Sequence, residues 1–241
     1  MKEKKSISNL DLYVLTQEIN DILAEGFVHN VYELEDKNKL KIRFRSKTGK
    51  QDLIVDPKTR VSLTNYDYPV PPFPSQFIMA LRKKINKLRV KRVYQYNMDR
   101  ILIIELQNAE GNLVNFIIEL FGNGNYVLTD PAGLVFIAKT YRQMKDRIIQ
   151  PKRPYEFPPT KGLDYLNLNW DEYLNVFNQA QAEDVGKTDA VRFISMNFNI
   201  GGYIAEEICT IANVHKNKPL QEIDDEEKKK LQLEKLGFLP V

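Results

Sequence analysis

Residues 100–130 read RILIIELQNAEGNLVNFIIELFGNGNYVLTD, and this stretch decides the fold of the first half of the chain. Its three apolar runs, ILIIEL, LVNFIIELF and YVLTD, are rich in β-branched and aromatic residues and are separated by segments rich in Gly and Asn. Apolar runs of this length bounded by such segments are typical of strands joined by turns. The stretch therefore predicts consecutive strands of one core, with Asp99 and Arg100 where the first strand begins.

A helix and then a strand meander are predicted upstream of this stretch. Ser8 and Asp11 have the spacing of a capping box, apolar residues follow at helical intervals, and Gly26 can end the helix. Residues 40–46, LKIRFRS, alternate apolar and basic side chains, which indicates a half-buried strand with a positive outer face. The segments DLIVD and RVSLT continue the meander, and the proline-rich YDYPVPPFP is expected to be a stiff extended connection.

A basic segment follows this connection. The formal net charge is only +3, yet residues 82–92, RKKINKLRVKR, contain seven Lys or Arg among eleven residues and no acid. Apolar residues at positions 77, 81, 85 and 88 predict that the segment lies on a helix. Like charges at this density repel one another, and contact with phosphates would offset the repulsion. The candidate contacts to a nucleic-acid backbone are Arg82, Lys83, Lys84, Lys87, Arg89, Lys91 and Arg92, which Arg43 and Arg45 could extend.

From Trp170 onward the apolar pattern becomes helical. Four helices are predicted, in WDEYLNVFNQA, AVRFISMNF, GGYIAEEICTIANV and DDEEKKKLQLEKL, with a Gly201–Gly202 turn between the second and the third. The proline-rich PKRPYEFPP, residues 151–159, is the natural boundary. We therefore predict a β-rich domain over residues 1–160 and a small all-helical domain over residues 165–241.

The sequence lacks the residues that several classes of function require. No apolar run approaches the roughly 20 residues that cross a bilayer, and no apolar segment follows the basic start, so neither a membrane span nor a secretory signal is expected. Cys209, the single cysteine, lies in an apolar stretch, which indicates a buried, inert thiol. His29 and His215 lie far apart, so no metal site or His-based triad can be assembled. We expect a cytoplasmic protein without catalytic residues, metal, cofactor or small-molecule substrate.

Three motifs together resemble the N-terminal domain of the NFACT family, whose members were historically called fibronectin-binding protein A homologues. They are SNLDLYVL near the start, LRKKINKLRVKRVYQYNMDRILII in the middle and IIELFGNGNYVLTD after it. The resemblance runs through essentially all 241 residues. Full-length members continue into a coiled coil and an RNA-binding domain; neither is contained in this sequence, so the chain is expected to be part of a longer protein.

A second resemblance, to the helix-two-turns-helix module of formamidopyrimidine-DNA glycosylases, covers NIGGYIAEEICTIANVHKNKPLQEIDDEEKKKL. It implies an α+β fold, in which an antiparallel β-sandwich with flanking helices precedes the helical module. There a glycine-rich turn approaches a nucleic-acid backbone, which would be the role of Gly201 and Gly202; without the resemblance, an ordinary helix–helix turn explains them as well. The N-terminal proline nucleophile and the cysteine zinc finger of the glycosylases are missing, so base-excision chemistry is expected to be lost.

The resemblance to the NFACT family implies a role in ribosome-associated quality control. Such proteins bind a large ribosomal subunit that carries a stalled nascent chain on peptidyl-tRNA, and they recruit tRNA for C-terminal tailing of that chain. The bond-forming chemistry belongs to the ribosome, so the chain is not expected to be an enzyme. In the family, the acid of the opening Leu-Asp and the Asp-Arg pair are implicated in recognising tRNA, and they match Asp11, Asp99 and Arg100.

Each of these three residues also has a plain structural interpretation. Asp11 completes a capping box, which stabilises a helix start by about 1 kcal/mol. Asp99 and Arg100 can close a turn, with the arginine in solvent. Two other functions remain open for the whole chain: a fibronectin-binding, adhesin-type interaction module, and a catalytically dead relative of the glycosylases that binds nucleic acid.

Overall fold

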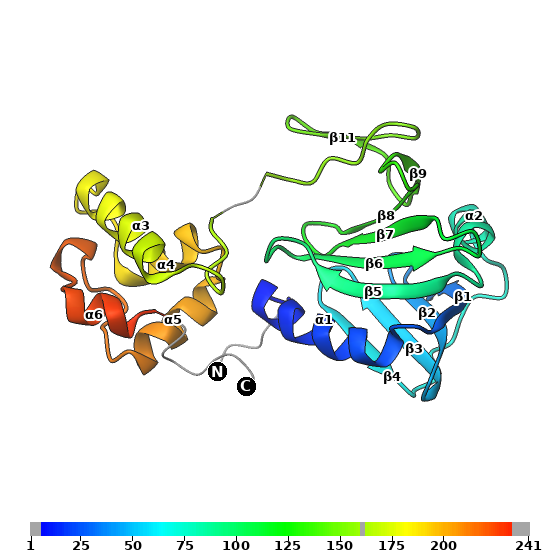
Figure 1. Ribbon diagram of the computed structural model, residues 1–241, viewed down its shortest axis with the longest axis horizontal. Coiled ribbons are helices and arrows are strands. Elements are labelled where there is room, and N and C mark those ends of the chain that lie inside the picture. The colour runs from blue at the N-terminus through cyan, green and yellow to red at the C-terminus, as the bar shows by residue number, and fades with distance from the viewer. Residues whose placement is uncertain (1–5, 160–161, 233–241) are drawn as a thin grey trace. The chain divides into compact units, whose positions relative to one another are not determined.

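The computed structural model describes residues 6–159 and 162–232. It divides the chain into two compact units, one ending at Pro159 and the other beginning at Thr160 (Figure 1). The first, called the sheet unit here, holds all the described strands, and the second, the helical unit, consists of short helices.

The sheet unit contains two helices and eleven strands among its described residues. In chain order these are α1 (Asn9–Leu23), β1 (Phe27–Glu33), β2 (Leu40–Ser46), β3 (Gly49–Asp56), β4 (Arg60–Thr64), α2 (Gln76–Ile85), β5 (Arg89–Gln95), β6 (Ile101–Gln107), β7 (Leu113–Glu119), β8 (Asn125–Thr129), β9 (Val135–Ala138), β10 (Arg142–Gln143) and β11 (Ile148–Ile149). Nine of the strands form one antiparallel sheet in the order β4-β3-β2-β1-β5-β6-β7-β8-β9, and β10 and β11 form a separate hairpin.

The nine-stranded sheet folds back on itself between β1 and β5. Those two strands share the one strand pair Phe27–Arg89, with further backbone hydrogen bonds on either side of it, whereas the other neighbours pair over longer stretches. Residues from both halves fill one core, and the Tyr126 hydroxyl of β8 donates a hydrogen bond shared between the carbonyls of Asn38 (2.8 Å) and Val55 (3.2 Å) in the other half. The predicted α+β fold, a β-sandwich with flanking helices, is therefore confirmed.

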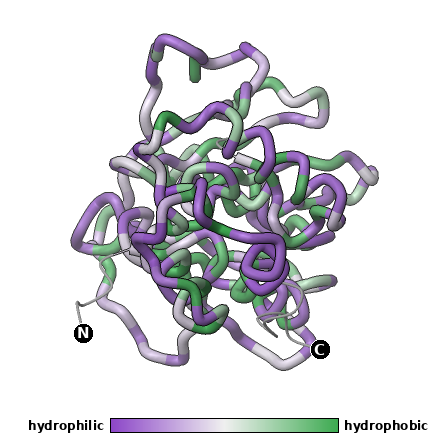
Figure 2. The backbone as a smooth tube through the Cα atoms, turned by 90° about the vertical axis from the view of Figure 1, so that its left-hand side faces the viewer, coloured by the Kyte–Doolittle hydropathy of each residue, from purple (hydrophilic) through white to green (hydrophobic). Residues whose placement is uncertain are grey.

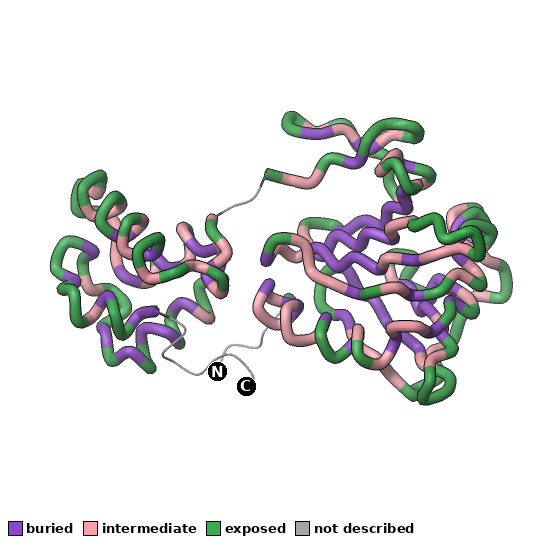
Figure 3. The backbone as a smooth tube through the Cα atoms, in the orientation of Figure 1, coloured by how far each residue is buried: buried purple, intermediate pink, exposed green. Residues whose placement is uncertain are grey.

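Strand β6, the ILIIEL run, is buried on both faces (Figure 3). Leu102, Ile104 and Leu106 point into the core between the two halves, whereas Ile101 and Ile103 belong to a second cluster on the opposite face. Strands covered on both sides read as continuous apolar runs instead of alternating ones. The second cluster also takes residues from β9, β11 and the chain around Tyr155, so this outer layer explains why ILII lacks polar positions.

Helix α1 lies along β5 and begins as the sequence predicts. Ser8 is its N-cap, and the Asp11 amide donates to the Ser8 Oγ while the Asp11 carboxylate accepts from the Ser8 amide (2.7 Å). Farther along, the Asn20 side chain accepts from the Val93 amide of β5 (2.8 Å). The capping bonds define the start of α1, and the Asn20–Val93 bond attaches the helix to β5.

The basic segment of residues 82–92 is not a single helix, so that expectation was wrong. Helix α2 ends at Ile85, Lys87 has a left-handed φ of 69°, and β5 begins at Arg89. The reason is pairing with distant strands: Val90 and Val93 are buried in the sheet, where β5 pairs with β6. Apolar residues spaced three or four positions apart fit the end of a helix and the start of a strand equally well. Pairing within the sheet selects the strand.

The helical unit is built from short helices around an aromatic core. Its elements are α3 (Trp170–Glu183), α4 (Ala190–Asn197), α5 (Gly202–Ile211), a 3-10 turn η1 (Leu220–Glu222) and α6 (Asp225–Lys230). Phe177, Phe193 and Phe198 pack together at its centre. The four predicted helices are present, although the end of the last predicted one, residues 233–236, lies outside the described residues.

Within the described residues, no helix is long and apolar enough to cross a membrane. Hydrophobic residues form short segments interrupted by hydrophilic ones along the chain (Figure 2). Cys209 is buried, and burial raises the pKa of its thiol to about 11, as expected for an inert cysteine.

Candidate nucleic-acid interface

Asp99 and Arg100 lie in the turn that joins β5 to β6. Asn97 and Met98, the two central residues of this turn, have φ values of 41° and 51°, and the Asp99 amide donates to the Tyr96 carbonyl (2.8 Å). Left-handed φ values at both central positions are typical of a type I′ hairpin turn, where Gly usually follows Asn. A methionine there is strained, and its side chain is buried, which helps to hold the turn in this shape.

The start of α1 is hydrogen-bonded to the same turn. The Asn9 side-chain amide donates to the Met98 carbonyl (3.1 Å). The Gln95 side-chain amide donates to the carbonyls of both Asn9 and Asp99, each at 2.8 Å. The structure thus brings the helix start that carries Asp11 and the turn that carries Asp99 and Arg100 to one edge of the sheet unit.

The three side chains at this edge are engaged to different degrees. The Asp11 carboxylate accepts from the Ser8 amide and Oγ (2.7 and 2.6 Å), so its capping role is real. The Asp99 carboxylate accepts from the backbone amide of Arg100 (2.7 Å), not from its guanidinium. Among the described residues, the half-buried Arg100 guanidinium makes no hydrogen bond or ion pair, so its planar set of donors is available to a phosphate or a base edge.

A supporting layer that the sequence did not reveal lies beside this turn. The Tyr96 ring stacks on Phe157 with centroids 3.6 Å apart and an angle of 9° between the rings. Phe157 in turn meets the edge of Tyr155 at 4.9 Å. Tyr96 thus packs against another ring of the chain.

Tyr155 connects this layer to a buried ion pair. Its hydroxyl donates to the Glu119 carboxylate (2.8 Å), and the Arg147 guanidinium donates to the same oxygen (2.7 Å). Burial and the Glu119 carboxylate raise the pKa of Tyr155. Glu119 pairs with Ile101 across β6 and β7, and the next residue, Leu120, donates its amide to the Arg100 carbonyl (2.8 Å). The ion pair is therefore adjacent to the Asp99–Arg100 turn.

Four of the seven basic residues of segment 82–92 have partners elsewhere in the chain. The Arg82 guanidinium donates to the Val31 carbonyl (2.6 Å) and lies over the Tyr32 ring. Arg89 and Lys91 both pair with Glu25, and Arg92 pairs with Glu105 at 3.1 Å. The segment contains no acid, and the acids that pair with three of these residues, Glu25 and Glu105, come from other parts of the chain.

The remaining three, Lys83, Lys84 and Lys87, are exposed and make no ion pair among the described residues. They lie at the end of α2 and just beyond it, near the start of β5, whereas Asp99 and Arg100 follow its end. Seven extended residues span about 20 Å. The structure therefore separates the two groups of candidate residues by roughly the length of this strand.

Strand β2 does not extend the basic surface through Arg43. Arg43 forms a two-pronged ion pair with Asp52 (2.8 Å for each bond), and Lys41 is buried against Asp67 (3.1 Å). Of the basic residues on this strand, Arg45 is the exposed one. The predicted positive outer face of residues 40–46 is therefore largely neutralised.

Gly201 and Gly202 are exposed at the start of α5. Gly201 is the N-cap, with φ −56° and ψ 147°, and no side chain caps this helix. A Cβ atom at either glycine would meet nothing within 4 Å, and neither has a left-handed φ. No contact within the described part of the chain therefore requires glycine at these two positions, in contrast to Gly162, where a Cβ would lie 2.7 Å from backbone atoms of α4 and its end.

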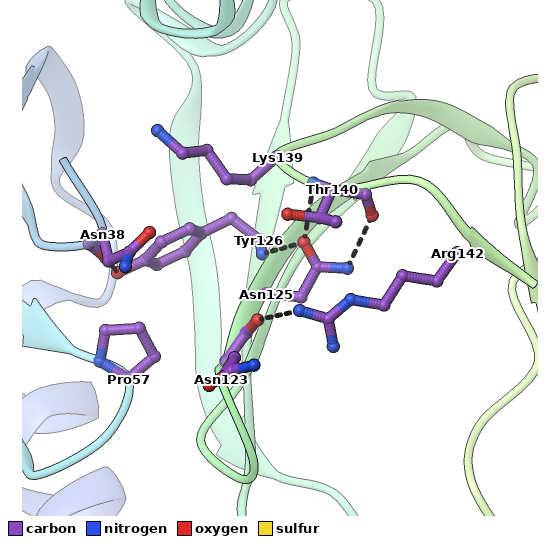
Figure 4. A pocket seen from close by; sticks show the side chains of 9 residues that line it. Asn38, Pro57, Asn123, Asn125, Tyr126, Lys139, Thr140 and Arg142 are labelled. Carbon is purple, nitrogen blue, oxygen red and sulfur yellow. Dashed lines mark hydrogen bonds between the residues drawn. The ribbon is translucent and has the colours of Figure 1, made fainter. Parts of the chain in front are cut away.

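A cavity of about 260 Å³ lies beside the β7–β8 turn (Figure 4). At its centre the Asn125 side chain accepts from the amides of Tyr126 and Thr140 and donates to the Thr140 carbonyl, each at 3.0 Å. Arg142 donates to the Gly124 carbonyl (3.0 Å), and Lys139 pairs with Glu33. The cavity's central polar groups bond mainly to neighbouring parts of the chain, which makes them structural supports of the turn.

The described residues contain no group of three or more His, Cys, Asp and Glu side chains that could hold a metal ion. His29 and His215 are both exposed.

Comparison with solved structures defines the class of the fold. The chain superimposes on the N-terminal region of the fibronectin/fibrinogen-binding protein from Streptococcus suis with a TM-score of 0.76, 20% sequence identity and coverage of 95% of this chain and 84% of the other. The N-terminal domain of the fibronectin-binding protein PavA from Streptococcus pneumoniae gives a TM-score of 0.72 at 22% identity, with coverage of 86% and 83%. At this identity the likeness shows a shared fold.

Sequence comparison then identifies the family. The family described as NFACT N-terminal and middle domains matches residues 8–235, so the chain belongs to the NFACT family, as the three motifs predicted. The archaeal Rqc2 homolog aRqcH of Methanocaldococcus jannaschii is 29% identical over 233 residues, 95% of this chain and 34% of the relative. Ribosome quality control complex subunit 2 of Saccharomyces cerevisiae is 35% identical over 128 residues, 53% of this chain and 12% of the relative. The chain thus spans well under two thirds of these relatives.

Proposed function

We propose that the chain is an RNA-binding module of a cytoplasmic ribosome-associated quality control factor. In this proposal it binds a large ribosomal subunit with a stalled nascent chain and recruits tRNA for C-terminal tailing, while the ribosome performs the bond-forming chemistry. The family match supports the general role, since the relatives are named as ribosome quality control subunits and their homologues. The likeness to fibronectin-binding proteins supports only the fold, at 20–22% identity.

One observation carries the tRNA-binding part of the proposal. The Arg100 guanidinium lacks a partner among the described residues, although the turn around it is held by hydrogen bonds from Gln95 and Asn9 and by the Tyr96–Phe157 stack. A cation held ready on a strained, well-supported turn is suited to bind an external anion or base edge. Asp99 fixes the backbone of Arg100, and Asp11 fixes the neighbouring helix start.

Replacing Asp99 and Arg100 together by alanine tests this role. We expect the affinity for bulk tRNA to fall about 10-fold to 100-fold, because one arginine contact to a phosphate or base is typically worth about 1–3 kcal/mol. Filter binding or fluorescence anisotropy at a fixed salt concentration measures the change.

The control is the exposed neighbouring pair Lys145 and Asp146, in the β10–β11 turn, also replaced by alanine. This variant removes the same two kinds of charge from another turn of the same unit. It should bind tRNA like the unmodified chain. Equal affinities for the two double variants would contradict the proposed role of Asp99 and Arg100.

The glycine turn of the helical unit allows a second test, in which stability and binding move in opposite directions. Gly202→Ala places alanine at the first position of α5, where it fits the backbone and should stabilise the unit by about 0.4–1 kcal/mol. If the turn approaches an RNA backbone, the added methyl group should still weaken RNA binding, by a few-fold. Thermal unfolding followed by Trp170 fluorescence and RNA titration check the two halves of this prediction. Unchanged RNA affinity in the stabilised variant would assign the glycines to an ordinary helix–helix turn.

A further inference from the structure

The surface around α2 combines free positive charge with exposed aromatic groups. Lys83, Lys84 and Lys87 make no ion pair among the described residues. A helix C-terminus favours cations, which is one reason for lysines in the last turn of α2. Lys87 lies beyond that helix in a left-handed conformation, so the helix dipole does not explain it. The three lysines form one basic group that the chain itself does not neutralise.

Large apolar side chains are exposed on α2, just before its N-terminus and on the neighbouring strand β9. Phe73, which lies two residues before the N-cap Ser75, is 86% exposed and is flanked by Pro72 and Pro74. Met79 is 52% exposed and lies one helical turn before Lys83 on the same face of α2. Phe136 of β9 is 39% exposed, and the Lys84 ammonium lies 4.5 Å from its ring centroid. We call these residues, Phe73, Met79, Lys83, Lys84, Lys87 and Phe136, the α2 surface.

The prolines on either side of Phe73 restrict the conformation of its backbone. Proline fixes its own φ and restricts the residue before it to extended conformations, so the PPFP segment limits the backbone freedom of Phe73. Little backbone entropy is then lost when the exposed ring stacks on a base. Stacking on an aromatic side chain is worth about 1–3 kcal/mol per base in single-stranded nucleic acids.

We propose that the α2 surface is a second RNA-binding site, which holds an unpaired RNA segment with its phosphates on Lys83, Lys84 and Lys87 and a base stacked on Phe73. Free cations select a polyanion, and exposed aromatic faces select unstacked bases, which a paired RNA helix does not offer. The proposal rests on the proposed function for the kind of partner. It goes beyond it by separating this site from the Asp99–Arg100 turn, which lies at the other end of β5.

The separation makes the two sites distinguishable by experiment. About 20 Å of strand lies between them, more than one nucleotide can bridge. An unpaired RNA of about four nucleotides is too short to cover the α2 surface and also reach Arg100, since a stacked strand advances about 3.4 Å per nucleotide, whereas a folded tRNA is long enough to meet both. Substitutions at one site should not alter the binding of a ligand that fills only the other.

The test uses an unstructured, fluorescently labelled RNA of about four nucleotides, at the short end of the lengths bound by a single-strand surface, and a blunt RNA duplex long enough to stay paired. Fluorescence anisotropy with the whole chain should show tighter binding of the unpaired RNA. Phe73→Ala should weaken that binding about 5-fold to 100-fold, as expected for one stacked base, and Phe73→Tyr should retain it. Replacing the three lysines by glutamine should reduce the slope of log affinity against log salt by about 2, as expected for three single-strand phosphate contacts.

Matched variants decide between the possible results. Tyr141→Ala removes another exposed aromatic ring, in the loop between β9 and β10, and should change nothing. The Asp99/Arg100 double alanine should bind the unpaired RNA normally. If Phe73→Ala binds like the unmodified chain, or if the duplex binds as well as the unpaired RNA, the proposal is overturned. If the unpaired RNA binds through Phe73 but the Asp99/Arg100 variant binds tRNA normally, the α2 surface stands and the proposed role of the turn does not.

Discussion

Replacing Arg147 by methionine is expected to destabilise the sheet unit by about 3–5 kcal/mol, because the change leaves the Glu119 carboxylate buried without its cation. Glu119 is fully buried and Arg147 is 4% exposed. Burial alone would lower the pKa of the Arg147 guanidinium, but its ion pair and hydrogen bond with Glu119 outweigh that effect and raise the pKa. The pair thus holds two charges away from water, and each charge depends on the other.

The double variant Glu119→Leu with Arg147→Met is the control for this prediction. It removes both charges and keeps apolar volume, so it should cost much less than the Arg147 single variant. Tyr155→Phe should cost about 1 kcal/mol, since it deletes one hydrogen bond and keeps the ring that packs on Phe157. Amide exchange of β6–β8 in urea measures the sheet unit, while fluorescence of Trp170, the only tryptophan, measures the helical unit. A double variant as unstable as Arg147→Met would show that packing, not charge, dominates here.

This ion pair also illustrates why the site could be predicted only in part. The run ILIIEL predicts a core strand, and the structure confirms it. Glu119, Arg147 and Tyr155 are spread over 37 residues, and no spacing in the sequence marks them as one cluster. Their common feature is burial under the outer layer, which exists only once residues 142–157 cover the sheet.

Short sequence motifs predicted the structure correctly where contacts between residues a few positions apart determine it. The Ser8–Asp11 capping box and the turns at Gly122–Asn125 follow from residues a few positions apart, and both are present. The end of α2 at Ile85 depends on the pairing of β5 with β6, and the neutralisation of Arg89 depends on Glu25, 64 residues away. Likewise, Asn9 reaches Met98 across 89 residues, which is why the sequence could place Asp11 and Asp99 in one site only through the family resemblance.

Gly124→Ala is expected to be the other strongly destabilising change, with a loss of about 3–4 kcal/mol. Gly124 has a φ of 69°, which costs alanine about 1–2 kcal/mol, and overpacking typically adds about 1–3 kcal/mol. The overpacking arises because a Cβ atom at this position would lie 2.1 Å from the Cβ of Pro57. Pro57 is buried in the turn between β3 and β4, so the two halves of the sandwich meet at this contact.

Gly122 supplies a control within the same turn. Its φ of 60° is as unfavourable for alanine, yet a Cβ atom there would meet nothing within 4 Å. Gly122→Ala should therefore cost only about 1–2 kcal/mol, the conformational part alone. The difference between the two variants in urea unfolding isolates the contact with Pro57. Adding Pro57→Gly to Gly124→Ala should recover part of the loss, because it removes the atoms that clash. If both glycine variants lose the same free energy of unfolding, the left-handed backbone alone explains why glycine occupies these two positions. Close packing of the two halves then does not require Gly124.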